Sequence, residues 1–87
     1  MTASEAKSIA DDKRAIVKEA DEIYTGIQNK ILECSNLGLY RTSVYINSDS
    51  YDAVKRAVEI LQEDDGFECG LEYKSGRASV VVSWENA

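Results

Sequence analysis

The sequence contains no histidine, no proline and only two cysteines among its 87 residues. Without histidine the chain lacks the commonest general base and the commonest zinc ligand, and every Ser–His or Cys–His catalytic arrangement is excluded. Cys34 and Cys69 lack the close spacing of metal ligands, and we expect buried free thiols rather than a disulfide. The sequence therefore predicts no catalytic residue, no metal and no cofactor.

Long apolar runs and an excess of positive charge are also missing. No segment has the length and hydrophobicity of a membrane span, and the N-terminus lacks the basic start and apolar core of a signal peptide. We therefore expect a cytoplasmic protein. Ten basic and sixteen acidic residues give a net charge of −6. Direct binding to nucleic acid or to an anionic membrane is not expected, because both need a basic field.

The absence of proline is most informative in the N-terminal part of the chain, where Gly26 is the only glycine over residues 4–36. Apolar side chains recur there at helical spacing, and Ile9, Ile16 and Ile23 repeat every seven residues. These features predict one helix over this range, about 45–50 Å long. The remaining chain is too short to cover it, so its first half needs a partner. The alternative is a core-packing helix whose free end frays in water. We predict a homo-oligomer with an interface formed by Ile9, Ile16, Val17, Ile23 and Tyr24.

The rest of the chain predicts a β-α-β-β unit over residues 39–84. Three segments alternate between apolar and polar side chains, as half-buried strands do, and a helical pattern lies between the first two. The third strand is the most β-branched, which favours the central position in a sheet. We therefore predict a single α+β domain over residues 1–87, with a three-stranded antiparallel sheet in the order 2-3-1 and both helices on one face. The expected ranges are 39–46, 67–74 and 78–84 for the strands and 50–65 for the helix.

Acidic side chains at the C-terminal end of the second helix and on the uncovered sheet face form the predicted binding site. Acidic residues at a helix C-terminus oppose the helix dipole, which indicates that they are retained for a basic partner. The sheet face opposite the helices would present Tyr45 beside small residues, a shallow mixed surface of the kind that binds proteins. Solvation alone also explains both features, because antiparallel sheets often leave one face to water. We predict a protein partner with a basic surface, bound by Tyr45, Glu63, Asp64, Asp65, Glu68 and Glu72.

A series of structural signals in the second half of the chain carries a family resemblance. The signals are a glycine-ended helix, a short strand, a second helix, a Gly-Phe step and a hairpin that ends in Ser-Trp. They are formed by Gly38, Ser43–Tyr45, Leu61, Gly66–Phe67 and Val82–Trp84. In these features the chain resembles small uncharacterised accessory proteins of bacteriophages and prophages. The resemblance implies a location in the host cytoplasm and a role as a virion component or as an inhibitor of a host or defence protein.

The sequence thus predicts a non-enzymatic, oligomeric accessory protein that binds another macromolecule and inhibits a host or defence protein. One alternative is a virion or assembly component in which the long helix is a packing element. An enzyme that uses Tyr45, Glu68 and Glu72 is a further alternative, although the chain lacks a metal motif and a phosphate-binding loop. A last alternative is a sponge that holds a small signalling nucleotide between subunits, for which the candidate basic residues are Arg14, Lys18, Arg41 and Arg77.

Overall fold

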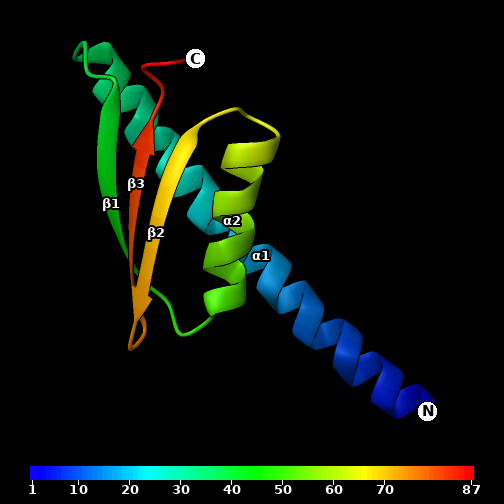
Figure 1. Ribbon diagram of the computed structural model, residues 1–87. Coiled ribbons are helices and arrows are strands. Elements are labelled where there is room, and N and C mark those ends of the chain that lie inside the picture. Colours follow the sequence, from blue (N-terminus) through cyan, green and yellow to red (C-terminus); the bar gives the residue numbers. More distant parts are fainter.

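The computed structural model describes all of the chain, residues 1–87. Its largest element is helix α1 (Ala3–Asn36), which has 34 residues in a molecule 54 Å long. The helix runs diagonally behind the sheet and projects beyond it at the N-terminal end (Figure 1). It begins one residue earlier than predicted, because the hydroxyl of Thr2 accepts a hydrogen bond from the Glu5 N–H at 3.2 Å and caps the first turn. The predicted single long helix is confirmed.

A glycine ends α1 and turns the chain sharply into the sheet. Gly38 has a φ of 80°, and the N–H of Leu39 donates to the carbonyl of Cys34 at 3.0 Å. This Schellman-type ending requires a residue that tolerates positive φ, which explains the glycine. Because the turn uses Leu39, strand β1 (Arg41–Asn47) begins two residues later than predicted.

Three seven-residue strands form one antiparallel sheet. Strand β3 (Arg77–Ser83) lies in the centre and pairs with β1 on one side and with β2 (Glu68–Lys74) on the other. The predicted strand order is therefore confirmed. The turn between β2 and β3 is tight, and Ser75 and Gly76 have φ values of 51° and 76°. Positive φ at both central residues is the geometry of a type I′ turn, whose twist matches that of the flanking strands.

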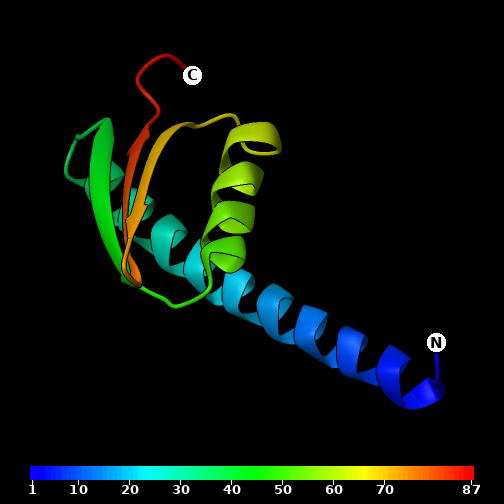
Figure 2. The same ribbon diagram turned by 60° about the horizontal axis from the view of Figure 1, so that its bottom comes forward.

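Helix α2 (Tyr51–Glu63) connects β1 to β2 and lies with α1 on one face of the sheet, as predicted (Figure 2). The hydroxyl of Ser50 accepts a hydrogen bond from the Ala53 N–H at 3.2 Å and caps its first turn. The apolar stripes of both helices meet the inward side chains of β3 in one core. This core consists of Ile27, Ile31, Val54, Val58, Leu61, Ala78, Val80 and Val82.

Burial divides α1 into two parts. No residue over 3–18 is buried, whereas Ala20 and Ile27 have no exposed surface. The boundary is marked by Glu19, whose carboxylate accepts a hydrogen bond from the hydroxyl of the buried Ser48 in the loop between β1 and α2. We call residues 3–18 the free half of α1 and residues 19–36 the docked half.

Candidate functional site

The side of the sheet that faces away from α1 and α2 is uncovered, and we call it the open face. The strand register places its side chains in four rows that cross all three strands in the order β1-β3-β2. The two central rows are Ser43–Val81–Gly70 and Tyr45–Ser79–Glu72. The two outer rows are Arg41–Ser83–Glu68 and, beside the β2–β3 turn, Asn47–Arg77–Lys74.

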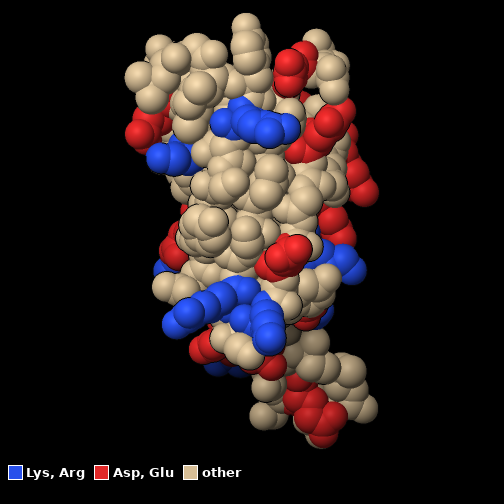
Figure 3. Space-filling view, turned by 60° about the vertical axis from the view of Figure 1, so that its left-hand side comes forward, with Lys and Arg blue, Asp and Glu red and all other residues tan.

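The centre of the open face is flat and largely uncharged. Tyr45 is 82% exposed and Val81 is 45% exposed, and their neighbours across the strands are serine or glycine, apart from Glu72 at one edge. Figure 3 looks onto this side and shows an uncharged belt with basic groups above and below it. The tyrosine ring therefore stands above a floor of small side chains, where a partner can reach it from several directions.

Charges lie at the two ends of the open face, and the ends differ. Arg41 shares its row with Glu68, so opposite charges lie on the two outer strands. At the other end Lys74 lies directly opposite Arg77. Neither of these cations forms an ion pair, because the two ion pairs of the chain lie within α1 and α2. The row beside the turn is therefore basic and not neutralised.

An open depression of about 710 Å³ adjoins this basic row. It combines two aromatic rings, one carboxylate, two cations and two serine hydroxyls, which suits recognition of a polar segment with at least one apolar side chain. Its lining residues are Tyr45, Glu72, Tyr73, Lys74, Ser75, Arg77, Ala78 and Ser79.

The acidic residues that follow α2 are partly engaged within the chain. The carboxylate of Asp65 accepts hydrogen bonds from the hydroxyl of Tyr24 and from the side-chain amide of Gln28, the latter at 3.0 Å. The hydrogen bond to Asp65, with a contribution from desolvation, raises the pKa of Tyr24 above its ordinary value. All three acidic residues are exposed, but Asp65 also joins the chain segment after α2 to the docked half of α1 through these hydrogen bonds.

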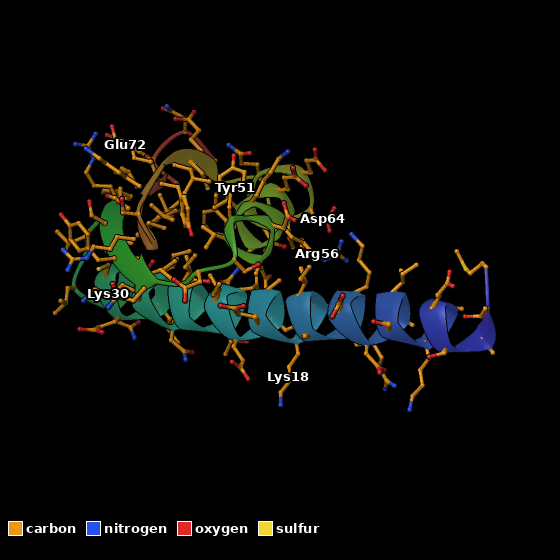
Figure 4. All side chains as sticks on the ribbon, turned by 90° about the horizontal axis from the view of Figure 1, so that it is seen from below. Lys18, Lys30, Tyr51, Arg56, Asp64 and Glu72 are labelled. Carbon is orange, nitrogen blue, oxygen red and sulfur yellow. The ribbon has the colours of Figure 1, made fainter.

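The six predicted partner-binding residues do not form one surface. Tyr45, Glu68 and Glu72 lie on the open face, but the acidic group that follows α2 lies on the helical side of the molecule. In Figure 4, Asp64 lies on the side of α2 that faces the projecting part of α1, and Glu72 lies on the sheet away from α1. Sequence spacing could not separate these groups, because only the packing of α2 decides on which side its end emerges.

The five residues predicted for the oligomer interface lie in two different environments. Ile23 and Tyr24 pack against the core of their own chain. Ile9 is 51% exposed and Val17 is 41% exposed, and Ile16 is half-buried. The part of the predicted interface that a second copy can reach is therefore the free half.

The four basic residues considered for a nucleotide site are spread over the molecule. Arg14 and Lys18 lie on the free half of α1, and Lys18 points away from the folded unit (Figure 4). Arg41 and Arg77 lie in opposite outer rows of the open face. A single chain does not bring these residues together.

Sequence reasoning missed one exposed apolar group at the corner where α1 turns into β1. Leu32, Leu37, Leu39 and Tyr40 all expose about half or more of their surface. The available signal was the Leu-Gly-Leu-Tyr run after the helix, which contains no charged residue to keep a loop solvated.

Both cysteines are free thiols, as predicted; Cys34 is buried and Cys69 is half-buried. Burial raises the pKa of the Cys69 thiol, which lowers its reactivity at neutral pH. No group of three or more Cys, Asp or Glu side chains is placed to hold a metal ion. Neither helix combines the length and the apolar character needed to cross a membrane. Comparisons of the chain with known protein families, curated proteins and solved structures return no match.

Proposed function

We propose that this chain is a non-enzymatic, self-associating protein that binds a partner protein on its open face. The observation that carries this proposal is the 82% exposure of Tyr45 above a floor of small side chains. A tyrosine brings a large, rigid contact area and a hydroxyl group to an interface, and it loses little conformational entropy when it docks. Such residues are enriched among those that dominate binding energy.

Self-association is proposed through the free half of α1. The apolar stripe that the docked half buries continues across the free half as Ile9 and Ile16. An isolated helix of this length is marginal in water, so burial of the stripe would stabilise it. Because the folded unit covers the apolar stripe of α1 from Ala20 onward, a second copy can reach this stripe only on the free half. An antiparallel pair keeps the two folded units at opposite ends of the contact and avoids a clash between them.

The proposed dimer presents two open faces. When one face has bound a dimeric or repetitive partner, the second face is held close to a second binding site, so two modest affinities combine into a stronger one. The resemblance to bacteriophage accessory proteins favours a host or defence protein as the partner, inhibited when its surface is covered. The basic partner surface predicted for Glu63, Asp64 and Asp65 remains a separate prediction, because this group and the open face lie on different sides of the molecule. Detection of the chain in purified virus particles would instead favour a structural component.

Affinity capture with matched variants tests the open face. We expect the wild-type chain to retain a specific protein from lysate of its host cell, and Tyr45→Ala to lose it. Tyr40→Ala is the control, because Tyr40 is 60% exposed but lies before β1, outside the open face. Retention of the same protein by Tyr45→Ala would contradict the proposal. Loss only with Glu63 and Asp64 changed to Lys, which leaves the hydrogen bonds of Asp65 intact, would move the site to the end of α2.

Native mass spectrometry of the untagged protein tests self-association. We expect a dimer, and we expect Ile9→Glu with Ile16→Glu to give a monomer, since each change places a carboxylate in the apolar stripe. Ala15→Glu adds the same side chain roughly 100° or more around the helix from Ile9 and Ile16, outside the apolar stripe, and should leave the dimer intact. A wild-type mass of 9.6 kDa would contradict this part of the proposal. Mass beyond that of the chains in the same spectrum would reveal a carried ligand.

A further inference from the structure

The basic row at the β2–β3 turn contains two cations that repel each other. Lys74 and Arg77 are directly opposite each other on neighbouring strands, an arrangement that destabilises a sheet. Asn47, the third member of the row, carries no charge to offset them. The two ion pairs of the chain involve other residues. The carboxylate of Asp49 lies beside Gly76 of the turn but is not paired with either cation, so Lys74 and Arg77 have no carboxylate within ion-pair distance.

The chain as a whole makes this basic row unusual. Residues 19–87 contain six basic and thirteen acidic side chains, so an acidic neighbour would be the expected environment of a cation. Two of those six basic side chains nevertheless share the row, which has no acidic member. Glu72, in the adjacent row on β2, is the nearest acid along that strand, and it forms no ion pair. An anion supplied from outside would relieve the repulsion.

The neighbouring row supplies an apolar contact at a defined distance. Tyr45 lies two residues along β1 from Asn47, which is about 7 Å in an extended strand. In an extended peptide, side chains on one face also repeat every two residues, about 7 Å apart. Arg77 lies one strand to the side of Asn47, a lateral step of about 4.8 Å. An extended segment that crosses the strands obliquely can therefore place a carboxylate at Arg77 and an apolar side chain two positions further along at Tyr45.

We propose that the turn end of the open face binds an acidic, extended segment of a partner protein. One or two carboxylates of that segment contact Lys74 and Arg77, and an apolar side chain two residues further along packs against Tyr45. This inference rests on the proposed function and names the chemistry of the partner. It is opposite in sign to the basic surface predicted for the acidic residues after α2, so the two surfaces suit different partners.

A protein segment fits this end of the molecule better than nucleic acid does. A phosphate backbone carries a charge at every nucleotide and would have to pass Glu72, which shares the row of Tyr45. The net charge of −6 would also repel it over the whole approach. A peptide with its carboxylates at one end avoids both repulsions.

A defined synthetic peptide tests the inference without knowledge of the natural partner. The probe is an acetylated peptide of two glutamates followed by alternating Val and Ser, added to the isotope-labelled full-length chain and followed by NMR. We expect the backbone resonances of Tyr45, Ser79 and Arg77 to shift. The affinity should fall about tenfold when glutamine replaces the two glutamates, because the charge-assisted contacts are lost, and it should fall further at high salt.

Matched protein variants locate the charge contact. Lys74→Glu with Arg77→Glu should reduce affinity for the glutamate peptide at least tenfold, and Lys74→Gln with Arg77→Gln should reduce it less. Lys55→Glu with Arg56→Glu changes the net charge by the same amount on the exposed side of α2 and should leave the affinity unchanged. The same spectra show whether each variant retains the fold.

Other outcomes overturn the inference in different ways. Equal binding of the glutamine peptide on the open face would remove the role of the cations while the open face remained a binding site. Tighter binding of an oligothymidylate would replace a protein segment with nucleic acid. Self-association that depends on Lys74 and Arg77 would make a second copy the occupant. If no peptide shifts the resonances of the open face but capture still depends on Tyr45, this inference fails and the proposed function stands. If there is neither a peptide-induced shift nor Tyr45-dependent capture, both the inference and the proposed function are rejected.

Discussion

The two halves of α1 share one helical periodicity and differ in what lies beside them. In the docked half, Ala20 and Ile27 have no exposed surface, whereas in the free half Ile9 is 51% exposed and Val17 is 41% exposed. The sheet and α2 lie beside the docked half, whereas the free half projects beyond them (Figure 1). Periodicity therefore identifies the apolar side of a helix, and its neighbours decide how much stabilisation that side provides.

Polar contacts reinforce this boundary. In the docked half, the carboxylate of Glu19 accepts a hydrogen bond from the hydroxyl of Ser48, and the hydroxyl of Tyr24 donates one to Asp65, so each contact joins residues distant in sequence. The only side-chain hydrogen bond at the other end is the local cap of Thr2 on the first turn. A free helix end keeps its polar groups hydrated, whereas a docked one needs specific partners for those groups that lose water.

The largest difference between the two halves should be seen in hydrogen exchange. In dilute solution, where the chain is monomeric, we expect amides over residues 6–16 to exchange on the order of a thousand times faster than those over residues 24–34. The free half opens by fraying, while the docked half opens only when the core unfolds. If the proposed dimer forms, protection over residues 6–16 should rise with protein concentration. Equal protection of both halves at the lowest concentration would contradict the division.

Matched side-chain truncations should change the free energy of unfolding by different amounts in the two halves. Ile27→Ala is expected to lower the free energy of unfolding by about 2–5 kcal/mol, because it leaves a cavity in the core. Ile9→Ala removes the same atoms from an exposed site and should change the free energy of unfolding by less than about 0.5 kcal/mol in the monomer. Urea unfolding followed by the fluorescence of Trp84 measures both. A loss of stability in Ile9→Ala that grows with protein concentration would show that this exposed residue stabilises the protein through association.

The hydrogen bond between Tyr24 and Asp65 should contribute a smaller amount to docking of α1 on α2. Tyr24→Phe is expected to cost about 1 kcal/mol at neutral pH, since it leaves the carboxylate without its hydroxyl donor. The pKa of Tyr24 is raised in the folded state, so the contribution is fully present below the unfolded pKa of about 10 and is lost as the pH rises through the folded value.

Unfolding measured for both proteins between pH 7 and pH 11 tests that pH dependence. The difference between wild type and Tyr24→Phe should stay constant up to about pH 9 and then shrink. A constant difference at all pH values would show that the loss is one of packing.

The smallest predicted effect is a gain in stability within the docked half. Gly26 is exposed, and a Cβ atom there would meet nothing within 4 Å. Gly26→Ala should therefore stabilise the fold by about 0.5–1 kcal/mol through helix propensity. Ala10→Gly makes the reverse change in the free half and should leave the unfolding midpoint of the core unaltered. A shift with Ala10→Gly in the monomer would show that the halves are cooperative.

Features that depend on residues close together in the chain could be predicted from the sequence. The long helix, the alternating strands and the central position of the Val80–Val82 strand all follow from local patterns and composition. Exposure of Tyr45 followed from its alternation along β1. These predictions succeed because side-chain periods of 3.6 and 2 residues depend only on the local backbone.

Features that depend on contacts between distant segments could not be predicted. Sequence spacing placed Tyr24 on the outward interface, but it bonds Asp65, which lies 41 residues away. The same contact removed Asp65 from the predicted binding group. The side-chain amide of Gln62 donates to the carbonyl of Cys69 at 3.2 Å and covers part of the β2 edge. Nothing in the local sequence of either segment indicates such a contact.

The sequence by itself therefore determined the elements of this protein, their apolar sides and the order of its strands. Only the tertiary structure decided where α1 divides, on which side the acidic end of α2 emerges, and that neither Lys74 nor Arg77 has an ion-pair partner. The physical reason is that backbone preferences act over a few residues, whereas burial and charge pairing depend on segments that folding brings together.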